Sequence, residues 1–156
     1  FNGGPNITAA ALDKIKGHFL LKKSTEVSVS LDFINQLEIS PSAARKYVNL
    51  LSGGNQQKIV IGKWLSMHPN VLIVDEPTRG IDVGSKAEIH NLIRELAAQG
   101  YAVIVISSEM PEVLHVSDRI VAMYSGKVMR TFTSEEVTED NLIQAISGIT
   151  ATDKVA

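Results

Sequence analysis

Residues 51–58, with the sequence Leu-Ser-Gly-Gly-Asn-Gln-Gln-Lys, combine groups that can bind an anion. Gly53 and Gly54 lack a Cβ, so the backbone amides beside them can approach a bound phosphate closely. A helix predicted to begin at about Asn55 adds unpaired N–H groups and the positive end of its dipole. Ser52 supplies a hydroxyl that can donate to a phosphate oxygen. The simpler alternative is a serine-capped helix after a Gly-Gly turn, which is common in proteins of any function.

A second group of reactive side chains follows an apolar run. The residues from Val71 to Val74 predict a buried parallel strand, and two acids follow at its C-terminal end, where open α/β sheets bind ligands. Asp75 is suited to hold Mg²⁺, usually through water, because magnesium prefers oxygen ligands and keeps its hydration shell. Glu76 is suited to polarise or deprotonate an attacking water. Taken alone, this pattern also fits a strand that runs into an acidic surface turn.

The composition excludes several other classes of function. The chain has 156 residues, of which 44% are hydrophobic and 21% charged, as expected for one globular domain. A formal net charge of −2 offers no basic surface for nucleic acid. The absence of cysteine excludes disulfides and thiolate metal sites, and the four histidines lack metal-site spacing. The longest apolar runs, such as Ala102 to Ile106, are too short to span a bilayer.

The first fifty residues have helical periodicity and little strand character. Turn-forming residues at 1–6 predict a loose lead-in. Helices are predicted from Thr8 to about Leu21, from Ser30 to Leu37 with Leu31 on its apolar face, and from Ala43 to about Tyr47. We therefore expect residues 1–50 to form an all-helical subdomain.

Residues 51–156 alternate between helix and strand patterns. Helices are predicted at 55–67, 86–99, 110–116 and 139–146, and strands at 71–75, 102–107, 119–124 and 127–132. The last two strands flank Ser125-Gly126, a two-residue hairpin turn. On the first of these helices, Trp64 is expected to pack in the core with Ile61 and Leu65. The pattern predicts an α/β sheet with helices, preceded by the all-helical segment.

Three segments together resemble the signature, Walker B and D-loop motifs of ABC ATPases. They are Ser52-Gly53-Gly54, Asp75-Glu76 and Gly80-Ile81-Asp82, in the order and spacing of that family. The amino-acid sequences of segments 51–58, 75–84 and 106–112 are similar to those of the second cassette of monosaccharide importers of the ribose, xylose and galactose type. The resemblance covers about Asn6 to Gly148. It implies part of a P-loop NTPase sheet with helices, with ATP and Mg²⁺ as cofactors.

The resemblance also implies a role for each matching residue. Five residues would face ATP held by the partner cassette, namely Ser52, Gly53, Gly54, Asn55 and Gln56. Asp82 would lie at the interface between the cassettes, Asp75 would bind Mg²⁺, and Glu76 would act on the attacking water. Residues 1–50 would dock on a membrane permease, and residues 51–156 would carry the signature helix and the C-terminal part of the ATPase core.

The parent protein would then be the ATPase subunit of a bacterial carbohydrate importer. It would be peripheral at the cytoplasmic face of the inner membrane, with a sister cassette in the same chain, a permease partner and no nucleic acid. The alternative is a soluble ABC-type ATPase without a permease, which shares the signature and Walker B motifs. Asn55 in the signature, the Arg79-Gly80 pair and the run Ser107-Ser108-Glu109 favour the importer.

One position departs from the usual ABC pattern. Most ABC ATPases have a histidine after the strand that follows Walker B, and this histidine contacts the γ-phosphate. The resemblance aligns Ser108 with it, which makes Ser108 a catalytic candidate. Serine can hydrogen-bond a phosphate but lacks the reach and charge of imidazole. We therefore expect the ATP site built on Asp75 and Glu76 to be slow or mainly to bind nucleotide.

A whole motif is also missing. The chain contains no Gly-x-x-x-x-Gly-Lys-Ser/Thr loop and begins with Phe1 rather than Met. We expect a fragment of a longer protein that alone binds ATP weakly at most and does not hydrolyse it. In this family the strand before the missing loop lies between the strand ending near Ser107 and a later one, here that of residues 119–124. The sheet should therefore have a gap or unpaired edges, which predict self-association, strand exchange or a rearranged sheet.

Overall fold

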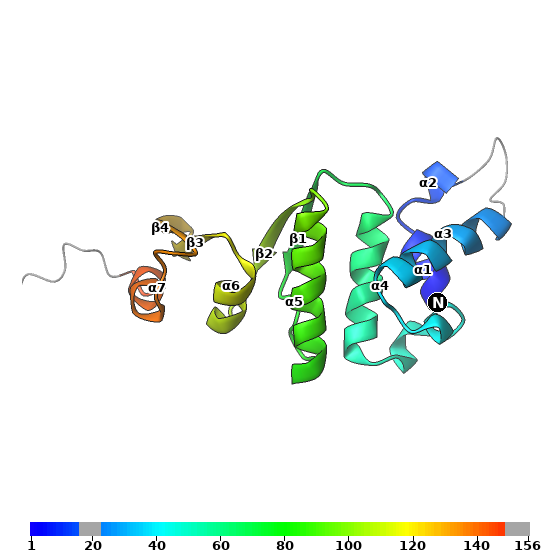
Figure 1. The fold of residues 1–156 in the computed structure, drawn as a ribbon, viewed down its shortest axis with the longest axis horizontal. Coiled ribbons are helices and arrows are strands. Elements are labelled where there is room, and N and C mark those ends of the chain that lie inside the picture. The colour runs from blue at the N-terminus through cyan, green and yellow to red at the C-terminus, as the bar shows by residue number, and fades with distance from the viewer. Residues whose placement is uncertain (16–22, 149–156) are drawn as a thin grey trace, which may run out of the picture. The chain divides into compact units, whose positions relative to one another are not determined.

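The computed structural model describes residues 1–15 and 23–148 (Figure 1). The chain divides into two compact units, Phe1–Ile106 and Ser107–Ala156, each with its own hydrophobic core. The first unit contains α1 (Gly3–Thr8), α2 (Leu12–Ile15), α3 (Lys23–Gln36), η1 (Pro41–Ala44), η2 (Val48–Leu50), α4 (Gly53–Leu65), β1 (Val71–Asp75), α5 (Val83–Ala98) and β2 (Ala102–Ile106). The second contains α6 (Met110–Val116), β3 (Arg119–Tyr124), β4 (Lys127–Thr133) and α7 (Glu139–Ile146).

The start of the chain is helical, so the predicted loose lead-in is wrong. Gly3 is buried in α1, and a Cβ on it would collide with the carbonyl oxygen of Ala43. The glycines that suggested a turn therefore allow close helix packing instead. The helix predicted from Thr8 is also wrong at its start, because α1 ends there and the chain turns before α2. The remainder of that predicted helix, residues 16–21, lies outside the described residues.

The other helices before residue 51 differ from the prediction in length and type. α3 begins at Lys23 rather than Ser30, and Leu31 is exposed while Phe33 and Ile34 are buried. The helix predicted from residue 43 is replaced by two short 3₁₀ turns, η1 and η2. Short 3₁₀ turns are common connectors between packed helices, and here Ala43 is fully buried between its neighbours. The segment is nevertheless helical with little strand character, as predicted.

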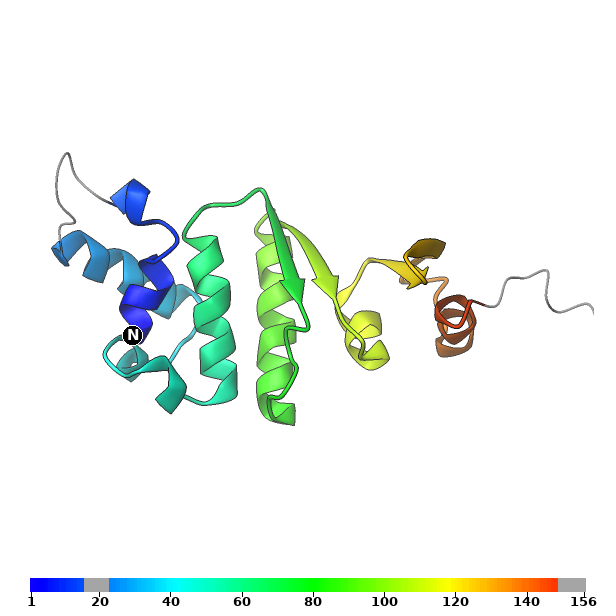
Figure 2. The same ribbon diagram turned by 180° about the vertical axis from the view of Figure 1, so that it is seen from behind.

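In the core of the first unit, α5 packs against the sheet formed by β1 and β2. The two strands are parallel, with Ile73 opposite Ile104, and α5 connects them. Leu72 and Val74 point from β1 into the core, where α5 contributes an apolar stripe. Figures 1 and 2 show α5 on one side of the two strands. The predicted bounds of β1 are confirmed, and those of β2 differ by one residue.

The opposite face of the same sheet is uncovered in the described residues. Ile73 is 61% exposed and Ile104 is 49% exposed, and Val71 and Ile106 are also exposed. The prediction of fully buried strands is therefore wrong for this face. We call it the bare face, defined by Val71, Ala102, Ile73, Ile104, Asp75 and Ile106. A parallel sheet normally has both faces covered, whereas within residues 1–15 and 23–148 this face has no covering layer.

α4 lies between the helical segment and α5. Ile61 and Leu65 are buried as predicted, but Trp64 is half exposed, with the ammonium of Lys63 5.3 Å from its ring centre. The core position expected for Trp64 is wrong, because about half of its surface is exposed in the part of the chain that the structure describes. Within the described residues, none of the helices is both long and apolar enough to cross a membrane.

The second unit is a β-hairpin packed against α7. β3 and β4 are antiparallel, and Ser125 and Gly126 both have positive φ, at 47° and 75°, as a tight two-residue turn requires. The core contains Ile120, Ala122, Phe132, Leu142 and Ala145. In the described residues, β2 and β3 belong to separate two-stranded sheets. The predicted gap or unpaired edges of the sheet stay a prediction, because β2 and β3 belong to different compact units.

Candidate functional site

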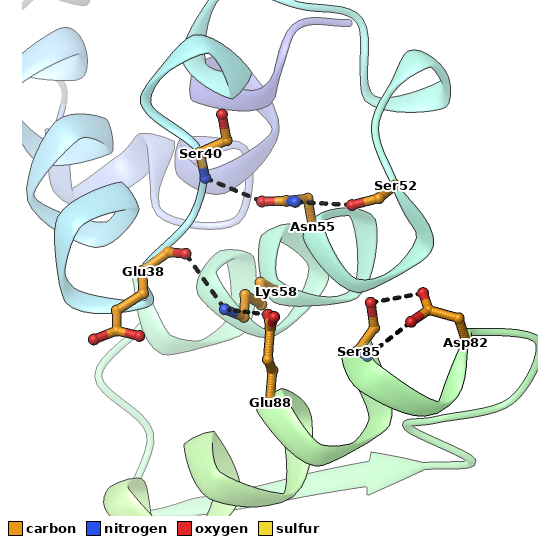
Figure 3. Close-up of polar contacts among 8 residues, drawn as sticks. All are labelled: Glu38, Ser40, Ser52, Asn55, Lys58, Asp82, Ser85 and Glu88. Carbon is orange, nitrogen blue, oxygen red and sulfur yellow. Dashed lines mark hydrogen bonds and ion pairs between the residues drawn. The ribbon is translucent and has the colours of Figure 1, made fainter.

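The signature segment lies at the N-terminal end of α4. Ser52 precedes the helix, and Gly53 and Gly54 are its first residues, so the helix begins earlier than predicted. Ser52 is exposed, and its hydroxyl does not cap the helix. It accepts a hydrogen bond from Nδ2 of Asn55 at 2.8 Å instead (Figure 3). The side-chain cap of the simpler interpretation is therefore not observed, and the N–H groups of this turn lie at the positive end of the helix.

Both glycines are required by the packing of this helix start. A Cβ on Gly53 would lie 2.8 Å from Cγ2 of Ile81, and a Cβ on Gly54 would lie 2.8 Å from the side chain of Ser85. Cβ atoms do not approach other heavy atoms this closely without displacement, so alanine at Gly53 would displace Ile81, and alanine at Gly54 would displace Ser85 at the start of α5. The structure thus brings the signature segment beside the predicted D-loop.

Asp82 has a structural role in addition to the one predicted for it. It caps α5, and its carboxylate accepts from the N–H of Ser85 at 3.0 Å and from the hydroxyl of Ser85 at 2.8 Å (Figure 3). These hydrogen bonds, the backbone one first, lower the pKa of Asp82. Ser85 therefore contacts both Asp82 and Gly54. Ser85 was not among the predicted site residues, although an aspartate before a predicted helix start is a recognisable capping signal.

The two acids lie at the C-terminal end of β1, as predicted. Asp75 is the last residue of the strand and is exposed, with Ile106 opposite it on β2. The N–H of Glu76 donates to the carbonyl of Ile106 at 2.8 Å, which extends the pairing by one residue. Glu76 has φ of 47°, a left-handed conformation that is uncommon outside glycine. Strained residues of this kind concentrate at functional sites.

The remaining predicted residues lie in two places. Gln56 is on the first turns of α4, and its side-chain amide donates to the carbonyl of Leu51 at 2.8 Å, which fixes the loop before the helix. Asn55 bonds both to Ser52 and to the backbone of Ser40. Ser108 belongs to the second unit, in the bend before α6. The structure therefore gathers Ser52, Gly53, Gly54, Asn55, Gln56 and Asp82 around the starts of α4 and α5.

Comparison with known proteins identifies the family. The sequence model of the ABC transporter family matches residues 4–79. The ribose import ATP-binding protein RbsA of Geobacillus kaustophilus is 46% identical to this chain over 143 residues, which is 92% of the chain. The xylose import ATP-binding protein XylG of Moorella thermoacetica is also 46% identical over 143 residues and 92% of the chain. The chain belongs to the ABC transporter family. It spans only 29% and 28% of the lengths of these two relatives.

Solved ABC cassettes share the fold. A dimeric ATP-binding cassette in a post-hydrolysis state, bound to ADP and Pi, superposes with a TM-score of 0.72 at 23% identity, over 86% of this chain and 57% of that one. An ATP-binding cassette of an ABC transporter in its ADP conformation gives a TM-score of 0.74 at 22% identity, over 97% of this chain and 61% of that one. The α/β ABC ATPase fold expected from the sequence is confirmed.

The side chains of this chain can be compared with what Mg²⁺ and the phosphates of ATP, the cofactors implied by the resemblance, require. The described residues contain no cluster of three or more histidine, cysteine or acidic side chains able to enclose a metal. Magnesium does not need one, because it usually binds through one or two carboxylates, waters and substrate phosphates. The single exposed carboxylate of Asp75 fits that mode. The helix start at Ser52 fits one side of a phosphate group.

Proposed function

We propose that this chain is the signature-to-C-terminal part of the second cassette of a bacterial carbohydrate importer. The intact protein would hydrolyse ATP and thereby drive uptake of a sugar. One observation carries the proposal: a helix start with an exposed serine hydroxyl lies beside the D-loop in a chain 46% identical to ribose and xylose import ATP-binding proteins. The ribose or xylose specificity of those relatives is not assigned to this chain.

The reaction would use two surfaces of the chain in two different ATP sites. The first is the start of α4, where the Ser52 hydroxyl and the N–H groups of Gly53 and Gly54 would contact the γ-phosphate of ATP held by the sister cassette. The second is the tip of β1, where Glu76 would orient water for attack on the γ-phosphorus. The bond from this phosphorus to the bridging oxygen would then break and leave ADP and phosphate.

Asp75, Asp82 and the helical segment also have a place in this scheme. Asp75 would hold Mg²⁺, which neutralises phosphate charge when bound. Asp82, already ordered by Ser85, would lie where the cassettes meet. The helices within residues 1–50 would contact the permease, which places the intact protein at the cytoplasmic face of the inner membrane.

One substitution in the intact protein tests the role proposed for the start of α4. Ser52→Ala should lower kcat by roughly a hundredfold, since removing one preorganised donor to a reacting phosphate typically has an effect of this size. Gln57→Ala, on the same helix turn, is the control and should leave kcat near the wild-type value. Equal rates for Ser52→Ala and the control would refute the role of the signature start.

The second ATP site is proposed to be slow, because Ser108 takes the place of the usual histidine. In single-turnover assays, Glu76→Gln should therefore remove only a minor part of total ATP hydrolysis. Glu135→Gln, a change of the same type at an exposed position in the second unit, serves as control. Loss of most turnover in Glu76→Gln would show that the site is fast.

This chain alone is proposed to bind Mg-ATP weakly and to hydrolyse none, because it lacks the phosphate loop. Isothermal titration with Mg-ATP should give no tight binding. Co-purification of the intact protein with a permease tests the transport role itself. An intact protein that purifies with ribosomes or DNA instead would favour the ABC ATPase without a permease.

We infer that isolated copies of this chain associate through β2 and the bare face. The bare face is apolar apart from Asp75 at one end, and β2 pairs with only one strand in the described residues. A two-fold packing of two such faces would place the Asp75 carboxylates at opposite ends, so they would not repel each other. Unpaired edges and apolar patches are the features that promote such contacts.

Sedimentation velocity across a range of concentrations tests this association. The wild-type chain should form a dimer, and Ile104→Lys should shift it toward the monomer. Val27→Lys on α3 is a matched control, because Val27 is about as exposed as Ile104, at 48% against 49%. A wild-type chain that stays monomeric, or equal effects of the two lysines, would contradict the inference.

A further inference from the structure

A tight turn at residues 38–40 connects the helical segment to the signature helix. α3 ends with the N–H of Ile39 donating to the carbonyl of Ile34 at 2.9 Å, and Glu38 has φ of 51°. This is the geometry of a helix end whose left-handed position is usually occupied by glycine. Glu38 holds that conformation although it carries a Cβ, and the adjacent Ile39 is buried in the core. The turn is therefore held in place by its surroundings.

α4 contacts this turn at two points. The backbone N–H of Ser40 donates to Oδ1 of Asn55 at 3.0 Å, and Nζ of Lys58 donates to the carbonyl of Glu38 at 3.3 Å (Figure 3). Asn55 and Lys58 are three residues apart and so share one face of the helix. Lys58 is only 5% exposed and also pairs with Glu88 of α5 at 3.0 Å. The lysine thus joins the turn after α3 to α4 and α5.

Asn55 connects the turn directly to the signature serine. Its Oδ1 accepts from the Ser40 backbone, while its Nδ2 donates to the Ser52 hydroxyl at 2.8 Å. A hydroxyl has one proton to donate and two lone pairs that accept. Because Asn55 fills one of those lone pairs, it restricts the directions in which the Ser52 proton can point. A shift of Ser40 would move the asparagine amide and change that direction.

We propose that Asn55 is a positioning residue rather than a phosphate ligand. Its amide couples the position of the Glu38–Ser40 turn to the orientation of the Ser52 hydroxyl, and Lys58 holds the other end of the turn against α4 and α5. The proposal rests on the phosphate role proposed for Ser52. Displacement of the helical segment would then weaken or strengthen phosphate binding at Ser52 without any change in the phosphate-binding groups themselves.

The first test is hydrogen exchange of the Ser40 amide, measured by NMR on this chain. Asn55→Ala should speed exchange at Ser40 by roughly fivefold, the effect of losing one hydrogen bond of ordinary strength. Asn55→Asp should restore protection, because its carboxylate still accepts from the Ser40 N–H. Gln57→Ala is the control and should change nothing at Ser40. Unchanged exchange in Asn55→Ala would overturn the proposal.

The second test asks whether Ser40 and the signature start at residues 52–54 respond together to nucleotide. In the wild-type chain, millimolar Mg-ATP should shift the amide resonances of Ser52, Gly53 and Gly54, and also that of Ser40. In Asn55→Ala the glycine shifts should remain while the Ser40 shift is lost. A Ser40 shift that persists in this variant would refute the coupling, as would a wild-type Ser40 resonance that never responds to nucleotide.

The two tests separate the coupling from the proposed function. If Mg-ATP shifts none of the amides at residues 52–54, the isolated chain binds nucleotide too weakly to report on the signature start. The rate of Ser52→Ala in the intact protein then decides the phosphate role, while the exchange measurement still decides whether Asn55 holds the turn. A purely structural role for Asn55 would lower the melting temperature without uncoupling Ser40 from the glycines. The melting temperature of Asn55→Ala is therefore measured alongside and should fall below that of Gln57→Ala by only about 2–4 °C, as expected for the loss of one hydrogen bond.

Discussion

The two faces of the β1–β2 sheet are built from the same kinds of residue but have opposite surroundings. Leu72 and Val74 lie under α5 and are almost fully buried, whereas Ile73 and Ile104 are about half exposed or more. Alternate side chains of a strand point to opposite faces, so a continuous apolar run provides two apolar faces. The comparison shows that hydrophobicity alone does not determine burial in this chain; the presence of a covering layer does.

The largest expected effect distinguishes the two faces directly. Leu72→Ala should lower the free energy of unfolding by about 2–5 kcal/mol, because it leaves a cavity in the core. Ile73→Ala, its neighbour on the bare face, should cost less than about 1 kcal/mol at low protein concentration. Urea unfolding followed by the fluorescence of Trp64, the single tryptophan, measures both. Similar losses for the two variants would mean that the bare face is covered in solution.

The next prediction concerns the covered side, where α4 meets α5. Gly54→Ala should cost about 1–3 kcal/mol, because a Cβ there would lie 2.8 Å from the side chain of Ser85. Gly84→Ala is the control, since its Cβ would lie 3.3 Å from one oxygen of the exposed Asp82 and alanine favours a helix. Equilibrium unfolding should place Gly84→Ala within about 1 kcal/mol of wild type. A tolerated Gly54→Ala would show that the two helix starts are not held together.

A smaller effect of opposite sign is expected at Thr78, in the turn after β1. Its hydroxyl is buried with no hydrogen-bond partner in the described structure. Thr78→Val should therefore raise the free energy of unfolding by up to about 1 kcal/mol, since an unpaired buried polar group is costly. Thr8→Val is the matched control, because the equally buried Thr8 hydroxyl bonds Glu26 and backbone carbonyls. The control should lose stability, and a loss in Thr78→Val would reveal a partner for its hydroxyl.

The smallest effect is a pH dependence at the exposed start of α5. The pKa of Asp82 is lowered in the folded chain, chiefly by the Ser85 backbone N–H. The charged cap therefore stabilises the fold above the ordinary aspartate pKa, and this contribution is lost as pH falls through the lowered value. Asp82→Asn should lose less stability than wild type over that acid range. The measurement is the melting temperature of both proteins from neutral to acid pH. An equal fall in the two melting temperatures would contradict this prediction.

The sequence predicted elements best where the local pattern and the packing agree. β1, α6, β3 and α7 match their predicted bounds, and the Ser125-Gly126 hairpin is confirmed by positive φ at both residues. The α1 helix was missed because Gly3 serves close packing against Ala43, a contact distant in sequence that resembles a turn signal locally. Exposure of Ile73 and Trp64 depends on which layers surround them, and residue type does not encode that.

The candidate site was predictable to a similar degree. The type and order of its residues followed from the sequence, and the structure places the signature start beside residues 81–85. The Asn55 bridge from Ser40 to Ser52 was not predictable, because it requires the end of α3 to lie against α4. Lys58 was likewise missed, since nothing in the sequence of α4 distinguishes a buried lysine from a solvated one.

The small core of the second unit has a consequence for how the chain resists proteases. In residues 107–148 the buried apolar side chains come from one hairpin and α7 alone, so little apolar surface opposes local opening. Cleavage by a protease depends on how often a segment opens far enough to enter the enzyme. Limited proteolysis should therefore first cut the chain beyond Ile106 and leave residues 1–106 as the more resistant fragment.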